Sequence, residues 1–257
     1  MMIKKPRILV TNDDGILSPG IKVLVDIVQK IGDVVVVAPD KPQSGQGHAI
    51  TLEYPLRLKK VNLFKGIESY ECSGTPVDCV KLAKNIILKN LDIDLCVSGI
   101  NHGSNASINI IYSGTMSAAM EASLEGINSI GFSYLDYSFK ADFTNCIPYI
   151  EAIIYQVLQK CILPSKLINV NIPVGEITGI KVCRQAKGVW VEEFKEAIDP
   201  RGQPYYWMTG KFDYHDRASD NDLKALENGY ISIVPSHHDL THYPSIESLD
   251  YLEKIEL

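Results

Sequence analysis

The stretch Arg7-Ile-Leu-Val-Thr-Asn-Asp-Asp-Gly15 places two adjacent carboxylates directly after a short apolar run. Neighbouring residues on a continuing strand point to opposite faces, so Asp13 and Asp14 serve one site only if the strand ends there and the chain turns. Gly15 permits that turn, because glycine adopts positive φ without steric cost. Two oxygen donors would then lie at the carboxyl end of a first strand, where open α/β sheets bind ligands. Taken alone, the same residues also fit an ordinary exposed turn.

The segments that follow alternate between strand and helix patterns. Ser18 and Pro19 form a typical helix start, a capping residue followed by proline at the first helical position, and Thr75-Pro76 repeats it. The expected elements are strands at 8–10, 33–38, 94–97 and 130–132, and helices at 18–32, 75–87, 113–124 and 146–162. This rhythm predicts an α/β fold with a doubly wound parallel sheet and right-handed crossovers.

The second half of the chain has a different character. Further strands are expected at 167–170, 179–182 and 230–234, but from about residue 184 the chain reads as loop-rich and aromatic. We therefore expect a catalytic core at 1–183 and a smaller β-rich C-terminal extension at 184–257. The aromatic stretch 190–207 fits an interface with another subunit, and it equally fits a satellite core within its own domain.

Composition narrows the class of protein. With 46% hydrophobic and 22% charged residues, the 257-residue chain resembles an ordinary globular protein, and its apolar runs are far shorter than the ~20 residues that span a bilayer. The basic N-terminus lacks the apolar run of a signal peptide, which predicts a cytoplasmic protein. The six cysteines form no CxxC pair and fit scattered buried thiols. A net charge of −6 argues against binding to a nucleic-acid polymer.

Oxygen-bearing loops follow several of the expected strands. Ser44 follows the second strand, Asn101 and Asn105 follow the strand at 94–97, and all these loops emerge at the sheet edge that carries the two aspartates. Two carboxylates, a hydroxyl and an amide oxygen are hard donors that suit Mg²⁺ or Mn²⁺ better than zinc.

The segment Ser113-Gly-Thr115 opens a helix at the same edge. A helix N-terminus with a glycine in its first turn is a ready anion site, although Ser113 and Thr115 also fit simple capping roles. A divalent cation facing a phosphate cradle is the basic equipment for metal-assisted hydrolysis of phosphate esters.

Five motifs occur in an order that resembles one family. They are Asn12-Asp-Asp-Gly15, Ala38-Pro-Asp with Gln43-Ser-Gly45, Ser73-Gly-Thr-Pro76, Val97-Ser-Gly-Ile-Asn-His-Gly-Ser-Asn105 and Tyr112-Ser-Gly-Thr115. In this order they resemble the SurE survival protein family of metal-dependent 5′/3′-nucleotidases. The likeness is close over residues 7–135 and looser around Gly229–Thr241.

The resemblance implies a Rossmann-like three-layer core and one divalent cation, Mg²⁺ or Mn²⁺, in each subunit. The implied metal ligands are Asp13, Asp14, Ser44 and Asn101. The implied phosphate contacts are Asn105, Ser113, Gly114 and Thr115. Asn12 would lie beside the metal and is counted with Asp13 among the catalytic residues. The family also implies a homodimer or homotetramer, with the C-terminal extension as its oligomerisation arm.

The resemblance implies hydrolysis of nucleoside monophosphates, and the expected reaction is the attack of a metal-activated water on their phosphorus. Asp13 is the expected residue to orient that water or accept its proton, because one oxygen can bind metal while the other stays free. His238 is a candidate general acid for the leaving nucleoside, and its surroundings equally fit a polar loop.

Other function classes meet specific objections. A dinucleotide oxidoreductase needs a G-x-G-x-x-G turn after the first strand, and a P-loop enzyme needs G-x-x-x-x-G-K-[ST]; the chain has neither. A metal-dependent nucleotide-binding or sensing protein without turnover is the alternative that remains.

Overall fold

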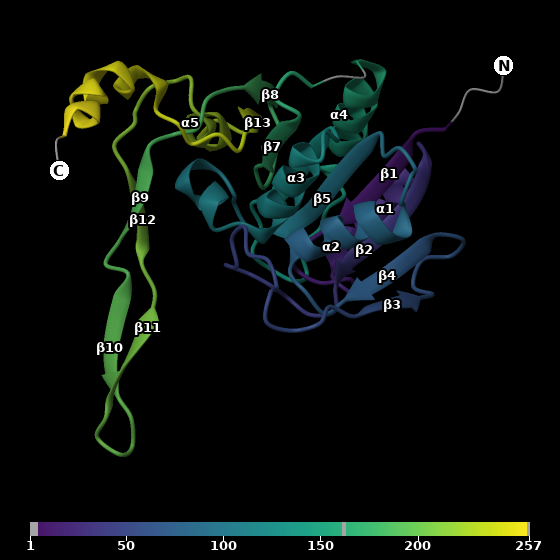
Figure 1. The fold of residues 1–257 in the computed structure, drawn as a ribbon, viewed down its shortest axis with the longest axis horizontal. Coiled ribbons are helices and arrows are strands. Elements are labelled where there is room, and N and C mark those ends of the chain that lie inside the picture. Colours follow the sequence, from purple (N-terminus) through teal and green to yellow (C-terminus); the bar gives the residue numbers. More distant parts are fainter. Residues whose placement is uncertain (1–4, 161–162, 256–257) are drawn as a thin grey trace.

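The β-branched runs form the centre of a large sheet (Figure 1). The computed structural model describes residues 5–160 and 163–255, and within them this sheet has nine strands. In spatial order the strands are β3 (Leu58–Val61), β4 (Glu68–Cys72), β2 (Asp33–Pro39), β1 (Arg7–Thr11), β5 (Leu95–His102), β6 (Ser129–Tyr134), β7 (Leu167–Ile172), β13 (Tyr230–Ser236) and β8 (Gly179–Val182). The strands from β4 to β7 are parallel, whereas β3 is antiparallel to β4 and β13 to β7.

Helices cover both faces of the sheet. On one face lie α1 (Pro19–Val28) and α4 (Ile147–Lys160); on the other lie α2 (Pro76–Leu82), its π-helical continuation η1 (Ala83–Ile87) and α3 (Gly114–Leu124). Alternate strand residues feed the two cores, since Ile8 and Val10 join the α1 and α4 side while Leu9 joins the α2 and α3 side. The predicted three-layer α/β fold with a mostly parallel sheet is confirmed.

The remaining helices are short. They are the 3₁₀ segments η2 (Ser107–Ile111), η3 (Tyr243–Ser245) and η4 (Glu247–Lys254), and the α-helix α5 (Asp222–Glu227). Helix α2 begins with a complete capping box, in which the Thr75 and Asp78 side chains each accept a backbone N–H of the other residue. No helix in the described ranges is long and apolar enough to cross a membrane.

One crossover departs from the expected right-handed pattern. The chain steps from β1 to β2 in one direction along the sheet and from β6 to β7 in the other, yet the connecting helices α1 and α4 pack on the same face. Two right-handed crossovers that run in opposite directions along a sheet place their helices on opposite faces. Because α1 and α4 lie on the same face, one of these two connections is right-handed and the other is left-handed. Phe143, in the segment before α4, is buried in the core that α1 and α4 share.

The β-rich character predicted for the C-terminal extension is confirmed, whereas the loop-rich stretch expected after residue 184 is wrong. The chain there forms two antiparallel ribbons, β9 (Gly188–Val191) with β12 (Lys211–Tyr214) and β10 (Phe194–Ile198) with β11 (Pro204–Met208). Figure 1 shows them as one long arm that leaves the core. The strand at 230–234 returns to the main sheet as β13, between β7 and β8. The domain boundary near residue 184 stays a prediction.

Two other boundaries also differ. Strand β5 continues to His102, so Ser98–Asn101 is strand rather than loop, because pairing with β6 resumes after a register shift between Ser98 and Asn101. Helix α4 ends at Lys160 in the described chain. The last two positions of the helix predicted at 146–162, which include Cys161, lie outside the described residues.

Strand β1 is the point where the order of the strands along the sheet reverses. Its neighbours are β2 on one side and β5 on the other, and the helices that follow β1 and β5 cover opposite faces. The loops after these two strands therefore diverge and leave a crevice between them, which is where doubly wound sheets bind ligands.

Candidate metal and phosphate site

The aspartate pair sits in a turn that Asn12 holds closed. The Asn12 side-chain amide donates to the Gly15 carbonyl at 2.9 Å and to the Ser18 hydroxyl at 2.8 Å. Gly15 has a φ of +89°, as the turn requires. The Ser18 side chain makes no capping bond to α1. Asn12 thus joins the end of β1 to the start of α1.

Asp13 is held by the start of α3. The Thr115 hydroxyl donates to Asp13 Oδ1 at 2.5 Å, and Asp13 is only 4% exposed. Gly114 allows this approach, since a Cβ there would lie 2.6 Å from Asp13 Cβ. Burial, together with the charge of Asp14, raises the pKa of Asp13 to about 6. The structure therefore uses Thr115 to position Asp13, a role that the sequence did not suggest.

Asp14 carries the least satisfied oxygen of the pair. Its Oδ2 is buried and has no hydrogen-bond partner among the described residues, and Asn12 Oδ1 is in the same condition. Burial raises the pKa of Asp14, while a hydrogen bond from the His102 backbone opposes the rise. Buried oxygens without donors need a positive charge or protons nearby. The pair therefore fits a bound cation.

The donor set also fits the kind of cation. No group of three or more His, Cys, Asp and Glu side chains gathers anywhere in residues 5–160 or 163–255, so a zinc-like cluster is absent from that part of the chain. The predicted set instead combines two carboxylates with neutral oxygens. That mixture suits a hard divalent cation such as Mg²⁺ or Mn²⁺.

The loop that carries Ser44 is tied to the site on both sides. The Gln43 N–H donates to the Asp13 carbonyl at 2.7 Å, and the Gly47 N–H donates to the Tyr112 carbonyl at 3.2 Å. These two bonds join the loop to the end of β1 and to the residue before the cap of α3. Ser44 lines the same pocket as the aspartates.

The two predicted asparagines are anchored differently. The Asn101 amide donates to the Gly103 carbonyl at 3.0 Å. Asn105 is buried in a polar network, where its amide donates to the Ser133 hydroxyl at 2.8 Å and its N–H donates to Asn171 Oδ1 at 2.8 Å. Both side chains line the pocket, and their positions are set by strands β5, β6 and β7.

Ser113 caps helix α3 and also faces the pocket. Its hydroxyl accepts the Met116 N–H at 3.0 Å, as a capping residue does. The capping role and the pocket-lining role, which the sequence left as alternatives, therefore coincide at this residue. Gly114 and Thr115 contact Asp13 and do not line the pocket.

Three of the six histidines bear on the site, and they lie in three different places. His102 lines the pocket, with its ring 5.4 Å from that of Phe139 and 5.5 Å from that of Phe143. His48 bonds to Glu121 at 2.9 Å. His238 lies on the exposed segment after β13 and does not line this pocket. The structure therefore does not bring His238 to the aspartates, and its role as general acid stays a prediction.

One cavity of about 650 Å³ gathers most of the predicted residues. Those that line it are Asp13, Asp14, Ser44, Asn101, Asn105 and Ser113. The sequence did not foresee its other wall, which is formed by Asn109, Tyr112, Tyr137, Trp190, Glu193, Met208 and Thr209. No signal in one sequence reveals that wall, because half of it comes from an arm whose path depends on cross-strand pairing.

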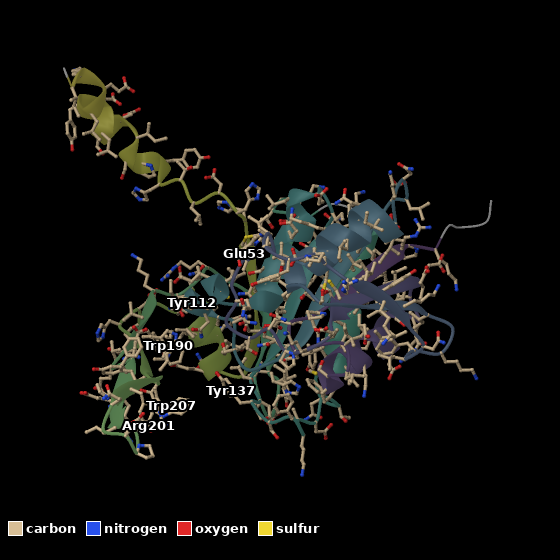
Figure 2. The ribbon with its side chains drawn as sticks, turned by 60° about the horizontal axis from the view of Figure 1, so that its bottom comes forward. Glu53, Tyr112, Tyr137, Trp190, Arg201 and Trp207 are labelled. Carbon is tan, nitrogen blue, oxygen red and sulfur yellow. The ribbon has the colours of Figure 1, made fainter. Side chains whose placement is uncertain are left out.

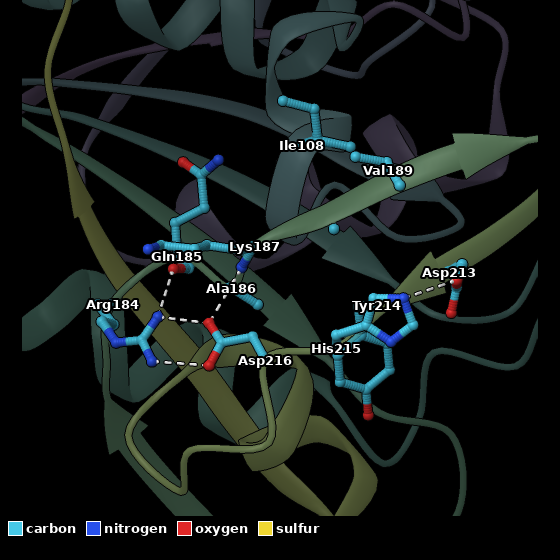
Figure 3. A pocket seen from close by; sticks show the side chains of 11 residues that line it. Ile108, Arg184, Gln185, Ala186, Lys187, Val189, Asp213, Tyr214, His215 and Asp216 are labelled. Carbon is cyan, nitrogen blue, oxygen red and sulfur yellow. Dashed lines mark hydrogen bonds and ion pairs between the residues drawn. The ribbon is translucent and has the colours of Figure 1, made fainter.

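A larger cavity of about 880 Å³ lies where the arm joins the core (Figure 3). Arg184 forms a two-pronged ion pair with Asp216 at 2.6 and 2.9 Å, and the Lys187 N–H donates to Asp216 at 3.1 Å. None of the predicted site residues lines this cavity. Its main charges already pair with each other, so we place the candidate site in the smaller cavity.

Comparison with known proteins points to one family. A family model described as "Survival protein SurE" matches residues 8–192. The chain is 56% identical over 252 residues to a protein of Flavobacterium psychrophilum named 5′-nucleotidase SurE, covering 96% of this chain and 98% of that one. A namesake from Flavobacterium johnsoniae is 55% identical, covering 97% of this chain and 98% of that one. The crystal structure of SurE protein from Aquifex aeolicus is 40% identical, with a TM-score of 0.82, and the match covers 96% of this chain and all of that one.

Glu121 links the Ser44 loop to both helices of one face. It is buried on α3, and its carboxylate pairs with His48 at 2.9 Å and with Lys81 of α2 at 2.5 Å. The hydrogen bond from His48 is the main cause that lowers the pKa of Glu121, and that from Lys81 adds to it. A lowered carboxyl pKa stabilises the fold above the unfolded value of 4.5, and this contribution disappears as pH falls through the folded value.

We therefore expect Glu121→Gln to lower the free energy of unfolding by about 1–2 kcal/mol at pH 7. The difference from wild type should shrink as pH falls from 4.5 through the lower pKa of the folded state, because the wild-type carboxyl then becomes protonated as well. Urea unfolding at pH 7 and at a series of pH values below 4.5 measures the difference in free energy of unfolding. Glu125→Gln, at the exposed end of the same helix, is the control. A difference that does not change with pH would contradict the ionic role of Glu121.

Proposed function

Because the chain belongs to the survival protein SurE family, we propose that it removes phosphate from nucleoside 5′- and 3′-monophosphates with the help of one divalent cation. As a member of this family, the chain is a hydrolase of phosphate monoesters. The observation that best supports the finer proposal is the buried, unpartnered Asp14 oxygen next to Asp13 and the start of α3. In that arrangement, a cation and a phosphate would bind next to each other in one cavity.

The cation would be held by Asp13, Asp14, Ser44 and Asn101, as Mg²⁺ or Mn²⁺. When bound, it supplies positive charge to the phosphate oxygens and lowers the pKa of a nearby water. Asp13 suits the task of orienting the attacking water and taking its proton, because Thr115 fixes one of its oxygens. Asn12 keeps the turn closed, so both carboxylates stay at the same end of β1.

The phosphate would lie at the start of α3. The positive end of the helix faces the pocket through Ser113, whose hydroxyl hydrogen stays free to donate while its oxygen accepts the Met116 N–H. Asn105 lies beside it on a buried polar network, which limits its movement. Donors fixed before the substrate arrives stabilise the charge that develops on phosphate oxygens without reorganising.

We also propose that the chain assembles into a homodimer or homotetramer through its arm and C-terminal helices. Both carry exposed apolar side chains, which are Phe194, Ile198, Tyr205, Tyr206, Trp207 and Met208 on the arm and Tyr243, Ile246, Leu249, Tyr251 and Leu252 at the C-terminal end. Exposed apolar surface of this extent is typical of protein interfaces. A cytoplasmic location stays a prediction from the sequence.

The reaction is tested by phosphate release from a panel of nucleoside monophosphates. We expect release with Mg²⁺ or Mn²⁺, none with EDTA, and a loss of ~100-fold or more in Asp14→Asn, because the cation that would stabilise charge on the phosphate loses a ligand. The melting temperature of wild type should also rise with the cation, and this rise should be absent in Asp14→Asn. Asp26→Asn, on the exposed face of α1, is the matched control.

A nucleotide-binding protein without turnover is the second candidate function. It is distinguished by the same assay: cation-dependent binding of nucleotide with no phosphate release under any metal would replace the nucleotidase proposal. Release that continues in EDTA and in Asp14→Asn would instead overturn the placement of the cation at the aspartate pair.

The assembly is tested by light scattering after size-exclusion chromatography. We expect wild type to be a dimer or larger, and Ile198→Lys with Tyr206→Lys to give a smaller mass, because each places a charge on an apolar interface. Val174→Lys changes an exposed apolar residue of the core instead and should leave the mass unchanged. A monomeric wild type, or a double variant of unchanged mass, would rule out the arm as the interface.

A further inference from the structure

We propose that the start of the arm forms the nucleoside-binding wall of the pocket, in which Trp190 stacks on the base and Glu193 favours bases that carry an exocyclic amino group. The inference rests on the proposed nucleotidase function and adds residues that recognise the substrate. Its basis is the division of the 650 Å³ cavity into two chemically different ends. A cavity of this size suits a drug-sized molecule rather than a lone phosphate.

The two ends come from different parts of the fold. The polar end is built from the carboxyl edge of the sheet and the start of α3. The opposite wall is largely aromatic and apolar, with Tyr112, Tyr137, Trp190 and Met208. Figure 2 labels the three aromatic residues in the region where the arm meets the core. A nucleoside monophosphate has the same division, with a charged phosphate at one end and a flat ring at the other.

Trp190 is held in a way that leaves ring surface for a ligand. Its indole N–H donates to Asn109 Oδ1 at 2.9 Å, and its ring meets the edge of Phe212 at 5.5 Å. The arm backbone at Gly210 packs closely against the indole, since a Cβ there would lie 3.1 Å from the ring. Trp190 nevertheless remains 39% exposed and lines the cavity. A fixed, partly exposed indole is a good platform for stacking a base.

The distance between the aromatic wall and the phosphate end of the cavity is also fixed. Asn109 belongs to η2, which leads through Tyr112 directly into Ser113, the cap of α3. Tyr137 packs against the site backbone, because a Cβ at Gly103 would lie 2.4 Å from its ring. The base platform and the phosphate cradle are therefore joined by a short stretch of chain and one side-chain hydrogen bond.

Glu193 supplies an acidic residue to this wall. Its carbonyl accepts the Thr209 N–H at 2.7 Å, which fixes the backbone, and the residue lines the cavity. Adenine, cytosine and guanine present an exocyclic amino group to a carboxylate acceptor, and guanine adds a second N–H beside it. Uracil presents one N–H between two carbonyl oxygens, which a carboxylate repels. Glu193 therefore favours amino-bearing bases, guanine most of all.

Steady-state phosphate release tests both residues. With guanosine monophosphate we expect Trp190→Ala to raise KM about 10-fold, because a base stacked on an aromatic ring loses its platform. With ribose 5-phosphate, which lacks a base, KM should change less than about 2-fold, since no stacking contact exists to lose. Glu193→Gln should reduce the preference for guanosine over uridine monophosphate several-fold and leave ribose 5-phosphate unaffected. Tyr155→Ala, which removes an exposed aromatic side chain on α4 outside the pocket and the arm, is the matched control.

A binding measurement separates recognition from turnover. The chain has two tryptophans, so Trp207→Phe leaves Trp190 as the single indole. We expect guanosine monophosphate to quench its fluorescence with saturation, and ribose 5-phosphate to leave it unchanged.

The outcomes distinguish the two proposals. Equal loss of activity on guanosine monophosphate and ribose 5-phosphate in Trp190→Ala, or no quenching, would overturn the nucleoside wall while the nucleotidase function stands. Saturable quenching without phosphate release from any substrate would overturn the nucleotidase function and support the wall.

Discussion

The structure depends on keeping two adjacent carboxylates together at the buried end of one strand. Water is largely excluded from Asp13, and one Asp14 oxygen has no donor among the described residues. Such an arrangement is costly unless positive charge or hydrogen-bond donors oppose it. The turn at Gly15, the Asn12 side chain and the first turn of α3 each serve this arrangement. The same negative charge, once paired with a cation, becomes the means to hold a phosphate.

The sheet explains why these parts meet. Strand β1 lies between β2 and β5, and the helices that follow β1 and β5 leave on opposite faces, so their loops separate at the end of β1. The Ser44 loop closes one side through bonds to Asp13 and Tyr112, and Glu121 secures it further along. The arm supplies the opposite wall. The pocket thus combines a polar floor from the edge of the sheet with a wall that the arm contributes.

Much of this site follows from local sequence. The end of β1, the glycine turn and the capped start of α3 depend on residues within a few positions of one another, and all three were predicted. Longer-range features were not. The extension of β5 depends on a register shift against β6, and the arm depends on pairs such as Trp190 with Phe212. The bond between Thr115 and Asp13 joins residues 102 positions apart, which no local pattern signals.

Calorimetric titration of metal-free protein with Mn²⁺, comparing wild type with Gly114→Ala, tests the central claim most directly. A Cβ at residue 114 would press on the Asp13 side chain at 2.6 Å without removing any donor atom. If the start of α3 positions the aspartate pair for a cation, wild type binds one Mn²⁺ per chain and the variant binds it ~10-fold or more weakly, as for lost support around a metal ligand. Equal affinity in a variant whose circular dichroism matches wild type would contradict this account.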